Sequence, residues 1–330
     1  MSDGRRRLVV AAGLLISAVA LFLVVRSIDL AEAASVLVSA NPVPLAAIVA
    51  LVAVQVALRA FRWSVLLPRL ADGRRIPFPR LVPPLLTGYL GNAVLPARLG
   101  EPMRAVVAAR RAGVGMPEAL GSVLVERVVD TATLASVAFV AALLVGAPGW
   151  VVPVLGLTAG AGVVVLATLL TVGAMPLVRL AHRIVPASRH GIRDVIERFG
   201  ASLGGPGRRP HLLAAAAIST TAWLLDAVSM WLVATSIGVA IDYPSAMLIA
   251  GVGTLGTAIP SAPGYVGTYE LAVAGIAGIV GVPPAPALAM AVLLHVMTLG
   301  PVAIGGAVSV VAIGADLGEV ARAAEASSRE

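Results

Sequence analysis

Long apolar runs separated by short clusters of arginine dominate this chain. The runs at 8–25, 43–67, 118–145 and 150–175 approach or exceed the roughly 20 residues that a helix needs to cross the apolar core of a bilayer. Hydrophobic residues make up 59% of the 330 residues and charged residues 12%. Such a chain has too little polar surface for a water-soluble protein. We therefore predict one all-α integral membrane domain over residues 1–330, which crosses the cell membrane several times.

The composition also argues against several classes of function. The net charge of +7 rests on arginines, most of them between the apolar runs, and membrane topology explains this better than nucleic-acid binding does. The chain has no cysteine, and therefore no disulfide, thiolate metal site or thiol redox chemistry. It also lacks glycine-rich nucleotide loops and the short motifs of metalloproteases and serine hydrolases. We therefore expect no cofactor and no metal, and the sequence gives little support for an enzyme.

The positions of the arginines predict the topology. A triplet at 5–7 precedes the first apolar run, as in a signal peptide or an uncleaved first span, and the many later runs favour an uncleaved span that starts in the cytoplasm. All of the 24 basic residues except Arg26 and Arg127 then fall in predicted cytoplasmic segments. Both termini are cytoplasmic in this topology, including a tail at 314–330.

Two regions are too short and too broken by proline and glycine to form ordinary spans. The apolar stretch at 81–95 is bounded by prolines and has arginines on both flanks, so we predict a re-entrant hairpin from the cytoplasmic face. The stretches at 243–259 and 268–280 are the predicted limbs of a second hairpin. About six full spans complete the fold. The alternative is eight ordinary spans, of which two are short and tilted.

The two hairpins carry related sequences. Residues 88–101 and 253–270 share the pattern Gly-x-Leu-Gly-x-Ala-(Val/Ile), continue to a proline and close on a glutamate. The predicted order of span, span, hairpin and span occurs over 8–145 and again over 150–313, starting from opposite sides. We therefore predict two inverted repeats, an arrangement in which the broken helices of transporters form a substrate site near the bilayer midplane.

Asp226 is the clearest candidate for a functional residue. It lies about 15 residues into a predicted helix of roughly 28, which places it near the bilayer midplane at a rise of about 1.5 Å per residue. An ionisable group at this depth is a functional candidate by default. The alternative is a structural aspartate that accepts hydrogen bonds from the hydroxyl groups of Thr220, Thr221 or Ser229.

A charged trio, Glu126, Arg127 and Asp130, lies near the predicted cytoplasmic boundary, where charge costs less. Glu126 and Asp130 share one helix face because they are four residues apart. Two interpretations remain open at this stage. The trio contacts substrate, or it clamps the helix to arginines such as Arg98 or Arg104.

Polar residues of the two hairpins complete the candidate substrate site. Guanidinium groups at Arg98 and Arg104 suit a lipid phosphate, although both also obey the positive-inside rule. Glu270 either contacts substrate or pairs with an arginine from another element. His295 lies alone in a span and is more typical of a packed, hydrogen-bonded histidine than of a proton carrier. The hairpin candidates for substrate binding are Asn92, Arg98, Glu101, Arg104, Ser261, Tyr265, Tyr269 and Glu270.

Several motifs occur together and in order along the chain. They are Arg59-x-x-Arg62-Trp63; Gly88, Tyr89, Asn92, Pro96, Arg98, Gly100, Glu101 and Arg104; Glu126, Arg127 and Asp130; and Pro260, Pro263, Gly264, Gly267 and Glu270. This set resembles the flippase-like transmembrane domain of lysylphosphatidylglycerol synthases, over essentially the whole chain. Fused members of that family carry a cytosolic aminoacyl-transferase domain, which makes the lipid that the membrane domain moves. We expect a stand-alone member here, because the longest hydrophilic segment is too short for such a domain.

The resemblance implies a lipid flippase or transporter, acting on an aminoacyl-phosphatidylglycerol-like phospholipid or on a glycolipid or polyprenyl-linked lipid. Two alternatives are an intramembrane transferase that acts on a lipid-linked substrate, and a small-solute or ion carrier. The expected partner is the membrane lipid itself, and a second copy of the chain or a lipid-modifying enzyme is a further candidate. We expect no nucleic-acid partner.

Overall fold

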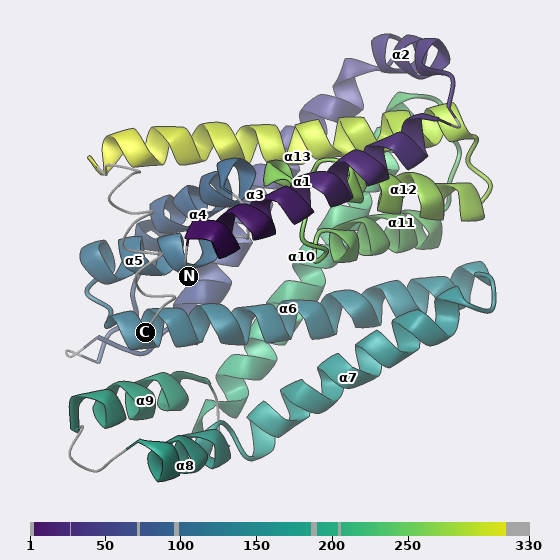
Figure 1. Ribbon diagram of the computed structural model, residues 1–330. Helices are drawn as coiled ribbons and strands as arrows, with labels where there is room; N and C mark the ends of the chain where they lie inside the picture. The colour runs from purple at the N-terminus through teal and green to yellow at the C-terminus, as the bar shows by residue number, and fades with distance from the viewer. Residues whose placement is uncertain are drawn as a thin grey trace.

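The computed structural model describes residues 3–26, 28–70, 73–95, 99–185, 190–203 and 206–314. Within these ranges the chain forms helices joined by loops and contains no strand (Figure 1). The helices are α1 (Asp3–Val25), α2 (Leu30–Val38), α3 (Pro42–Leu66), α4 (Val82–Val94), α5 (Gly100–Ala112), α6 (Met116–Val145), α7 (Val151–Thr171), α8 (Met175–Ile184), α9 (His190–Leu203), α10 (Arg209–Ser236), α11 (Tyr243–Gly256), α12 (Thr268–Ile279) and α13 (Pro284–Ala312). Single 3₁₀ turns include η1 (Phe78–Leu81) and η4 (Pro263–Tyr265).

In the part of the chain that the structure describes, five helices are long and apolar enough to cross a membrane: α3, α6, α7, α10 and α13. A sixth candidate is the pair formed by Ala11–Val25 of α1 and α2, which meet at 88°. The prediction of an all-helical membrane protein is therefore confirmed, with five or six candidate spans. The short helices α4, α5, α11 and α12 have only 12 to 14 residues each.

Local sequence explains where these helices begin and end. The side chain of Asn41 accepts a hydrogen bond from Val43 N at 2.9 Å and caps α3, which begins at Pro42. Proline suits this first helical position because its missing N–H would have no partner there. At the C-terminal end of α6, Gly146 adopts a left-handed conformation with φ 67°, which ends the helix and turns the chain into α7.

The first hairpin is larger than predicted. The sequence placed it within 81–95, but α4 is only its first limb, and the second limb is α5, which packs against α4. The limbs approach closely where Gly88 and Gly91 of α4 face Gly100 of α5. The second hairpin has the predicted limbs, α11 and α12, which also pack against each other. Each hairpin therefore consists of two short helices joined by a loop.

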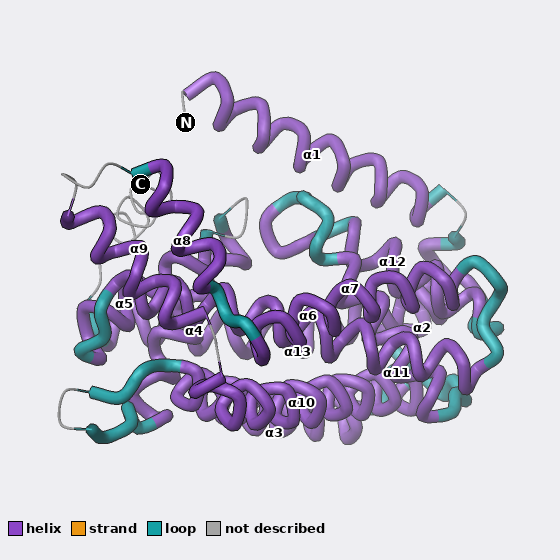
Figure 2. Tube along the Cα trace, turned by 90° about the horizontal axis from the view of Figure 1, so that it is seen from below, coloured by secondary structure: helices purple, strands orange, loops and turns teal. Residues whose placement is uncertain are grey.

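The long helices and hairpins follow the same order in both halves of the chain. α4 of the first hairpin packs against α13, and α11 of the second packs against α6, the corresponding helix of the first half. The second long helices, α3 and α10, pack against each other and run side by side in Figure 2. In Figure 1 the first hairpin lies at the end that holds α8 and α9, and the second lies at the opposite end.

The loop of the second hairpin reaches into the molecule and meets the first hairpin. Its turn η4 packs against α4, and Gly264 in this turn, at φ 71°, lies close to the carbonyl oxygen of Ala93. Helix α1 holds the same loop from outside, because Ser17 Oγ accepts a hydrogen bond from Ala262 N at 2.7 Å. The two hairpins therefore meet between the long helices.

Candidate functional site

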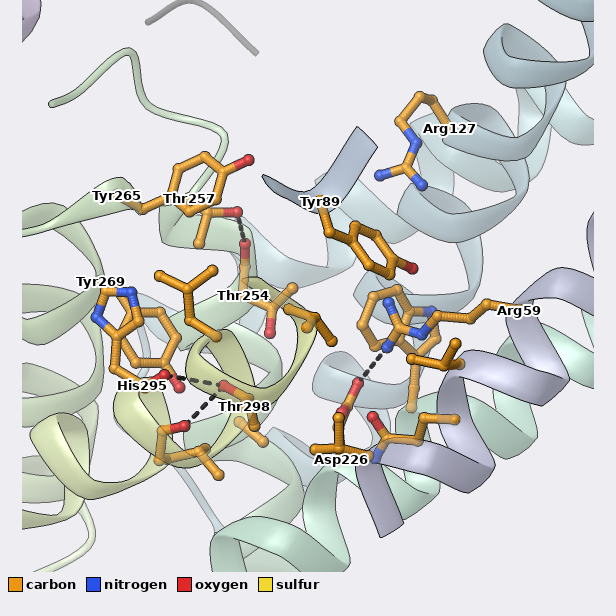
Figure 3. Close-up of a pocket in the computed structure, with 18 residues that line it drawn as sticks. Arg59, Tyr89, Arg127, Asp226, Thr254, Thr257, Tyr265, Tyr269, His295 and Thr298 are labelled. Atoms are coloured by element: carbon orange, nitrogen blue, oxygen red, sulfur yellow. Dashed lines mark hydrogen bonds and ion pairs between the residues drawn. The ribbon is translucent and has the colours of Figure 1, made fainter. Parts of the chain in front are cut away.

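A cavity of about 240 Å³ lies where the two halves meet. Its walls come from α3, α4 and α6 of the first half and from α10, α11, α13 and the second hairpin's loop and α12 (Figure 3). The polar and aromatic lining residues are Gln55, Arg59, Tyr89, Arg127, Trp223, Asp226, Thr254, Thr257, Tyr265, Tyr269, His295 and Thr298.

An ion pair lies on one side of this cavity. Arg59 Nη2 on α3 is 2.8 Å from Asp226 Oδ2 on α10, and the two side chains are only 17% and 19% exposed. The Arg59 guanidinium also covers the ring of Trp223, with its central carbon 4.8 Å from the ring centroid. Tyr89 lies beside Arg59 in Figure 3. Each of the two groups thus has a close partner of opposite formal charge inside an apolar bundle.

Aromatic and hydroxyl groups lie on the opposite side of the cavity (Figure 3). The Tyr269 ring packs on His295, with ring centroids 4.8 Å apart. His295 Nδ1 is 2.5 Å from Glu270 Oε1, and Glu270 Oε2 accepts a hydrogen bond from Gly267 N at 2.6 Å. Glu270 therefore fixes both the start of α12 and the imidazole ring that faces the cavity.

Tyr265 has an uncommon backbone conformation. Its φ is 62°, and it is the one non-glycine residue with positive φ in the described part of the chain. A side chain in this region costs about 1–3 kcal/mol unless its surroundings hold it there. Thr268 Oγ1 donates to the Tyr265 carbonyl oxygen at 3.1 Å and helps to hold this turn. Strain of this kind concentrates at functional sites, and here it brings the Tyr265 side chain into the wall of the cavity.

A buried cluster of three arginines and three carboxylates adjoins the cavity. One oxygen, Oε1 of Glu126, lies 2.8 Å from Arg104, 2.8 Å from Arg127 and 3.0 Å from Arg62. Asp130 pairs with Arg62 and, at 3.0 Å, with Arg127. Glu101 lies 3.4 Å from both Arg104 and Arg127. The cluster is balanced in charge and joins α3, α5 and α6.

Exposure divides the cluster into a core and an outer member. The Arg62, Arg104 and Glu126 side chains are at most 4% exposed, whereas Arg127 is 34% exposed and lines the cavity. Ser219 on α10 adds a hydrogen bond to Asp130 Oδ1 at 3.0 Å. The cluster core has the contacts of a structural clamp, and Arg127 is the member that can also reach a ligand.

The structure places the predicted site residues at several positions. Arg127, Asp226, Tyr265 and Tyr269 line the cavity. Glu101, Arg104, Glu126 and Asp130 lie in the buried cluster, while Glu270 supports the cavity wall through His295. Asn92 faces the α4–α5 contact near Gly100, and Ser261 lies against Gly13 of α1. Arg98 lies outside the described residues. As substrate-binding residues all of these remain predictions.

The structure pairs Asp226 with an arginine, and not with the hydroxyl groups that the sequence suggested. Thr220, Thr221 and Ser229 each donate to a carbonyl oxygen four residues earlier in α10, so their hydroxyl protons are already engaged. His295 is packed and hydrogen-bonded, as its isolation in a span indicated.

Arg59 is the main cavity residue that sequence reasoning missed. The sequence did contain a sign of its role, namely a charged residue within an apolar run. Arg59 lies seven residues before the end of α3, well inside an apolar helix. The positive-inside rule does not require an arginine at that depth, whereas an aspartate within another span offers it a partner. Trp223 and the threonines of α11 and α13 carried no comparable signal.

Comparison with known proteins places the chain in a family. The model of the lysylphosphatidylglycerol synthase TM region matches residues 10–306. A curated relative, "Glycosyltransferase AglD" of Haloferax volcanii, is 31% identical over 98% of this chain. The chain spans 58% of that relative's length. From the family match over most of its length, we conclude that this chain belongs to the lysylphosphatidylglycerol synthase transmembrane-region family.

Proposed function

We propose that this protein moves a lipid with a polar head group between the two leaflets of the cell membrane. The observation that carries the proposal is the cavity between the two halves, which places an ion pair, tyrosines and threonines inside a bundle of apolar helices. A polar chamber in such surroundings suits a head group that must leave water while its hydrocarbon chains stay in the bilayer.

The charged and hydroxyl groups suggest how a head group is held. Arg127 and Arg59 offer guanidinium donors to a phosphate, and the loss of one of their present carboxylate contacts accompanies binding. The hydroxyl groups of Tyr265, Thr254 and Thr298 face the remainder of the head group. The head group thus exchanges hydrogen bonds with water for hydrogen bonds with the protein.

The two hairpins supply the moving parts in this proposal. We interpret the two halves as inverted repeats, because corresponding helices make corresponding contacts, α4 with α13 and α11 with α6. Each hairpin lies at one end of the bundle, and the two meet beside the cavity. Displacement of one hairpin would open the cavity to one side of the membrane while the other stays closed, as in alternating access.

A vesicle assay tests the proposal. The purified protein is reconstituted in vesicles of phosphatidylcholine and phosphatidylglycerol with a trace of phosphatidylglycerol that carries a fluorophore on its acyl chain. Dithionite added outside quenches only the outer leaflet, so complete quenching reports exchange. We expect faster exchange than in protein-free vesicles, and slower exchange after Asp226→Asn. Asp29→Asn is the matched control, because Asp29 caps α2 outside the cavity and asparagine caps a helix equally well.

The assay is repeated with a fluorescent aminoacyl-phosphatidylglycerol and with a polyprenyl-linked sugar. Exchange of any of the three lipids that depends on Asp226 supports the proposal and identifies the preferred head group. If none of the three lipids exchanges faster in vesicles with the protein than in protein-free vesicles, the proposal is contradicted. Uptake of a small solute in their place would favour a carrier.

The name of the Haloferax volcanii relative, a glycosyltransferase, supports a second candidate, an intramembrane transferase that acts on a lipid-linked sugar. The same vesicles distinguish it, because a transferase changes the mass of the lipid and a flippase does not. Mass spectrometry of the recovered lipid, with and without a sugar donor, gives the answer. A covalently altered lipid in the absence of exchange would replace the first candidate by the second.

A further inference from the structure

The two hairpins carry glutamates at equivalent places. Glu101 and Glu270 close the related sequences of the two hairpins, and each lies in the first turn of the second limb, α5 or α12. Each glutamate pairs with a basic residue on the next long helix of its own half. Glu101 Oε1 lies 3.4 Å from Arg127 Nη1 on α6, and Glu270 Oε1 lies 2.5 Å from His295 Nδ1 on α13.

The two basic residues also occupy equivalent positions. Each is the twelfth residue of its helix, counted from Met116 of α6 and from Pro284 of α13. Both Arg127 and His295 line the cavity. A ligand in the cavity can therefore reach one basic residue from each half of the chain, and each of these residues connects the cavity to one hairpin.

The pair of Glu270 and His295 connects the cavity to the loop of the second hairpin. The two side chains are 8% and 12% exposed. Glu270 Oε2 accepts a hydrogen bond at 2.6 Å from the backbone of Gly267, which ends this loop at φ 92°. The loop also carries Tyr265 of the cavity wall and packs through η4 against α4. A change in the contact between Glu270 and His295 would therefore act directly on part of the cavity wall.

The two pairs differ in one chemical property. The guanidinium of an arginine keeps its charge at physiological pH, whereas an imidazole gains or loses a proton between about pH 5 and 8. A cationic imidazole donates a charge-assisted hydrogen bond to a carboxylate, and such a bond is roughly twice as strong as a neutral one. The contact of Glu270 should therefore vary with pH, whereas the contact of Glu101 should not.

We propose that Glu270 and His295 form a proton-binding site of the cavity, and that the bound proton strengthens the contact that holds the loop of the second hairpin in the cavity wall. This inference rests on the proposed function, because it concerns the opening of the same cavity. Loss of the proton weakens the contact with Glu270 and releases the loop. Arg127 and Glu101 hold the first hairpin equally at every pH, so the proton controls opening at the end of the second hairpin.

Charged and titratable groups face His295 from the elements packed against α13. On α2, which packs on Ala285 near the start of α13, the charged residue is Glu32. The other groups line the same cavity: Arg59 on α3, Tyr89 on α4, Asp226 on α10, and Tyr265 and Tyr269 of the second hairpin. Arg59 and Asp226 are paired with each other, and tyrosine hydroxyls keep their protons in this pH range. We therefore expect the charge of His295 to follow the pH.

Three histidine variants give a matched test. His295→Gln keeps an amide donor for Glu270 but binds no proton, and His295→Arg gives the second hairpin the permanent charge of the first. His182→Gln is the control, because His182 also lies near a glutamate, 3.6 Å from Glu197 Oε1, but on α8 and outside the cavity. The unfolding temperature in detergent shows that each variant is folded.

Hydrogen–deuterium exchange measures the hold on the loop without any lipid transport. The protein is placed in nanodiscs of phosphatidylcholine and phosphatidylglycerol, and peptides from the loop between α11 and α12 are followed by mass spectrometry between about pH 5 and 8. Comparison at the same pH removes the intrinsic pH dependence of amide exchange. We expect the wild-type loop to become several-fold more protected than the His295→Gln loop as the pH falls. His295→Arg should protect the loop at every pH, and His182→Gln should behave like the wild type.

Lipid exchange should follow the same pattern. Albumin extraction of a short-chain fluorescent lipid replaces dithionite, which decomposes in acid. We expect wild-type exchange to slow several-fold between about pH 8 and 5, because the second hairpin opens less often when His295 is protonated. His295→Gln should remove most of this pH dependence, and His295→Arg should keep exchange slow throughout.

Two results would overturn the inference. One is a wild-type loop whose protection matches that of His295→Gln at every pH. The other is a pH response that is lost in Asp226→Asn but kept in His295→Gln, which would assign the proton to Asp226.

The two proposals fail in different ways. Loop protection that depends on pH and on His295, without any lipid exchange, would retain the proton site and contradict the flippase. Lipid exchange that depends on Asp226, without a pH response of the loop, would retain the flippase and contradict the proton site.

Discussion

The guanidinium of Arg59 lies 2.8 Å from the carboxylate of Asp226, and this contact joins the two helices, α3 and α10, that occupy corresponding positions in the two halves of the chain. Each partner alone would place an isolated charge inside an apolar bundle. The pair is also part of the cavity wall. The same pair therefore both holds α3 to α10 and contributes to the surface that a ligand in the cavity would contact.

Removal of one member of this pair should destabilise the protein more than removal of both. Asp226→Asn and Arg59→Gln each leave a partly buried group without its partner, at a cost of about 1–3 kcal/mol. Arg59→Met combined with Asp226→Leu should lower the unfolding temperature in detergent by less than either single change does, because no charged group is left without its partner. Lipid exchange should be lost in the double variant even where folding recovers. Exchange at the wild-type rate in that variant would remove the pair from the transport path.

Arg62 and Arg127 should respond differently to truncation, although both contact Glu126 and Asp130. Arg62 is 1% exposed, so Arg62→Ala leaves two buried carboxylates short of a partner, and we expect a loss of about 3–5 kcal/mol or failure to accumulate in the membrane. Arg127 is 34% exposed, and water replaces part of its contribution. The Arg127→Ala variant should therefore still fold, but it should exchange lipid more slowly than the wild type. Equal thermal stability of the two variants would contradict the division of this cluster into a buried clamp and an outer, ligand-facing arginine.

Glu270 should matter for the order of the second hairpin. Glu270→Ala removes acceptors for Gly267 N and His295 Nδ1, and we expect a loss of about 1–3 kcal/mol. Glu270→Gln keeps an amide oxygen for Gly267 N and an amide nitrogen for His295, so its unfolding temperature in detergent should stay close to that of the wild type. If glutamine is as damaging as alanine, the charge of Glu270 matters and not only its hydrogen bonds.

Both hairpins could be predicted from the sequence because proline and glycine act on the backbone locally. The sequence did not predict that α5 forms the second limb of the first hairpin. Helix α5 carries Glu101, Arg104 and two further arginines, which resemble an aqueous loop in a hydropathy profile. Arg104 becomes buried only because Glu126 of α6 comes within 2.8 Å of it. A pairing of this kind depends on tertiary structure.

Dependence on tertiary structure also explains which residues of the candidate site could be predicted and which could not. Asp226 stood out because a lone carboxylate in a span has few structural explanations. Arg62 lies nearer the predicted cytoplasmic end of its span, where arginines are common, and the sequence does not reveal that its side chain is 1% exposed. The cavity itself depends on how α3, α10 and the two hairpins pack together. The sequence therefore indicated several of its residues but not their neighbours.

The predicted orientation can be checked directly, because the natural chain has no cysteine. Arg75, in the loop between α3 and η1, and Gly149, in the turn between α6 and α7, are both exposed. A membrane-impermeant maleimide should label Gly149→Cys in whole cells, and Arg75→Cys only after the cells are opened. The reverse pattern would invert the topology, and labelling of both in whole cells would contradict the positive-inside assignment.

Gly100 should tolerate no side chain, because it lies where the limbs of the first hairpin touch. A Cβ at this position would overlap the carbonyl oxygen of Gly88 and lie 2.6 Å from Asn92 N, and both are backbone atoms that cannot move without displacing α4. We expect Gly100→Ala to cost at least about 1–3 kcal/mol and to slow lipid exchange.

Gly275 on α12 is the matched control for Gly100, since no atom lies within 4 Å of a Cβ placed there. Gly275→Ala should raise helix stability by up to about 1 kcal/mol and leave exchange unchanged. The measurements are the unfolding temperature in detergent and the exchange rate in vesicles. If Gly100→Ala folds and exchanges lipid like Gly275→Ala, the close contact between α4 and α5 is not needed for function. It would then be wrong that each hairpin moves as a rigid pair of helices held together by its glycine contacts.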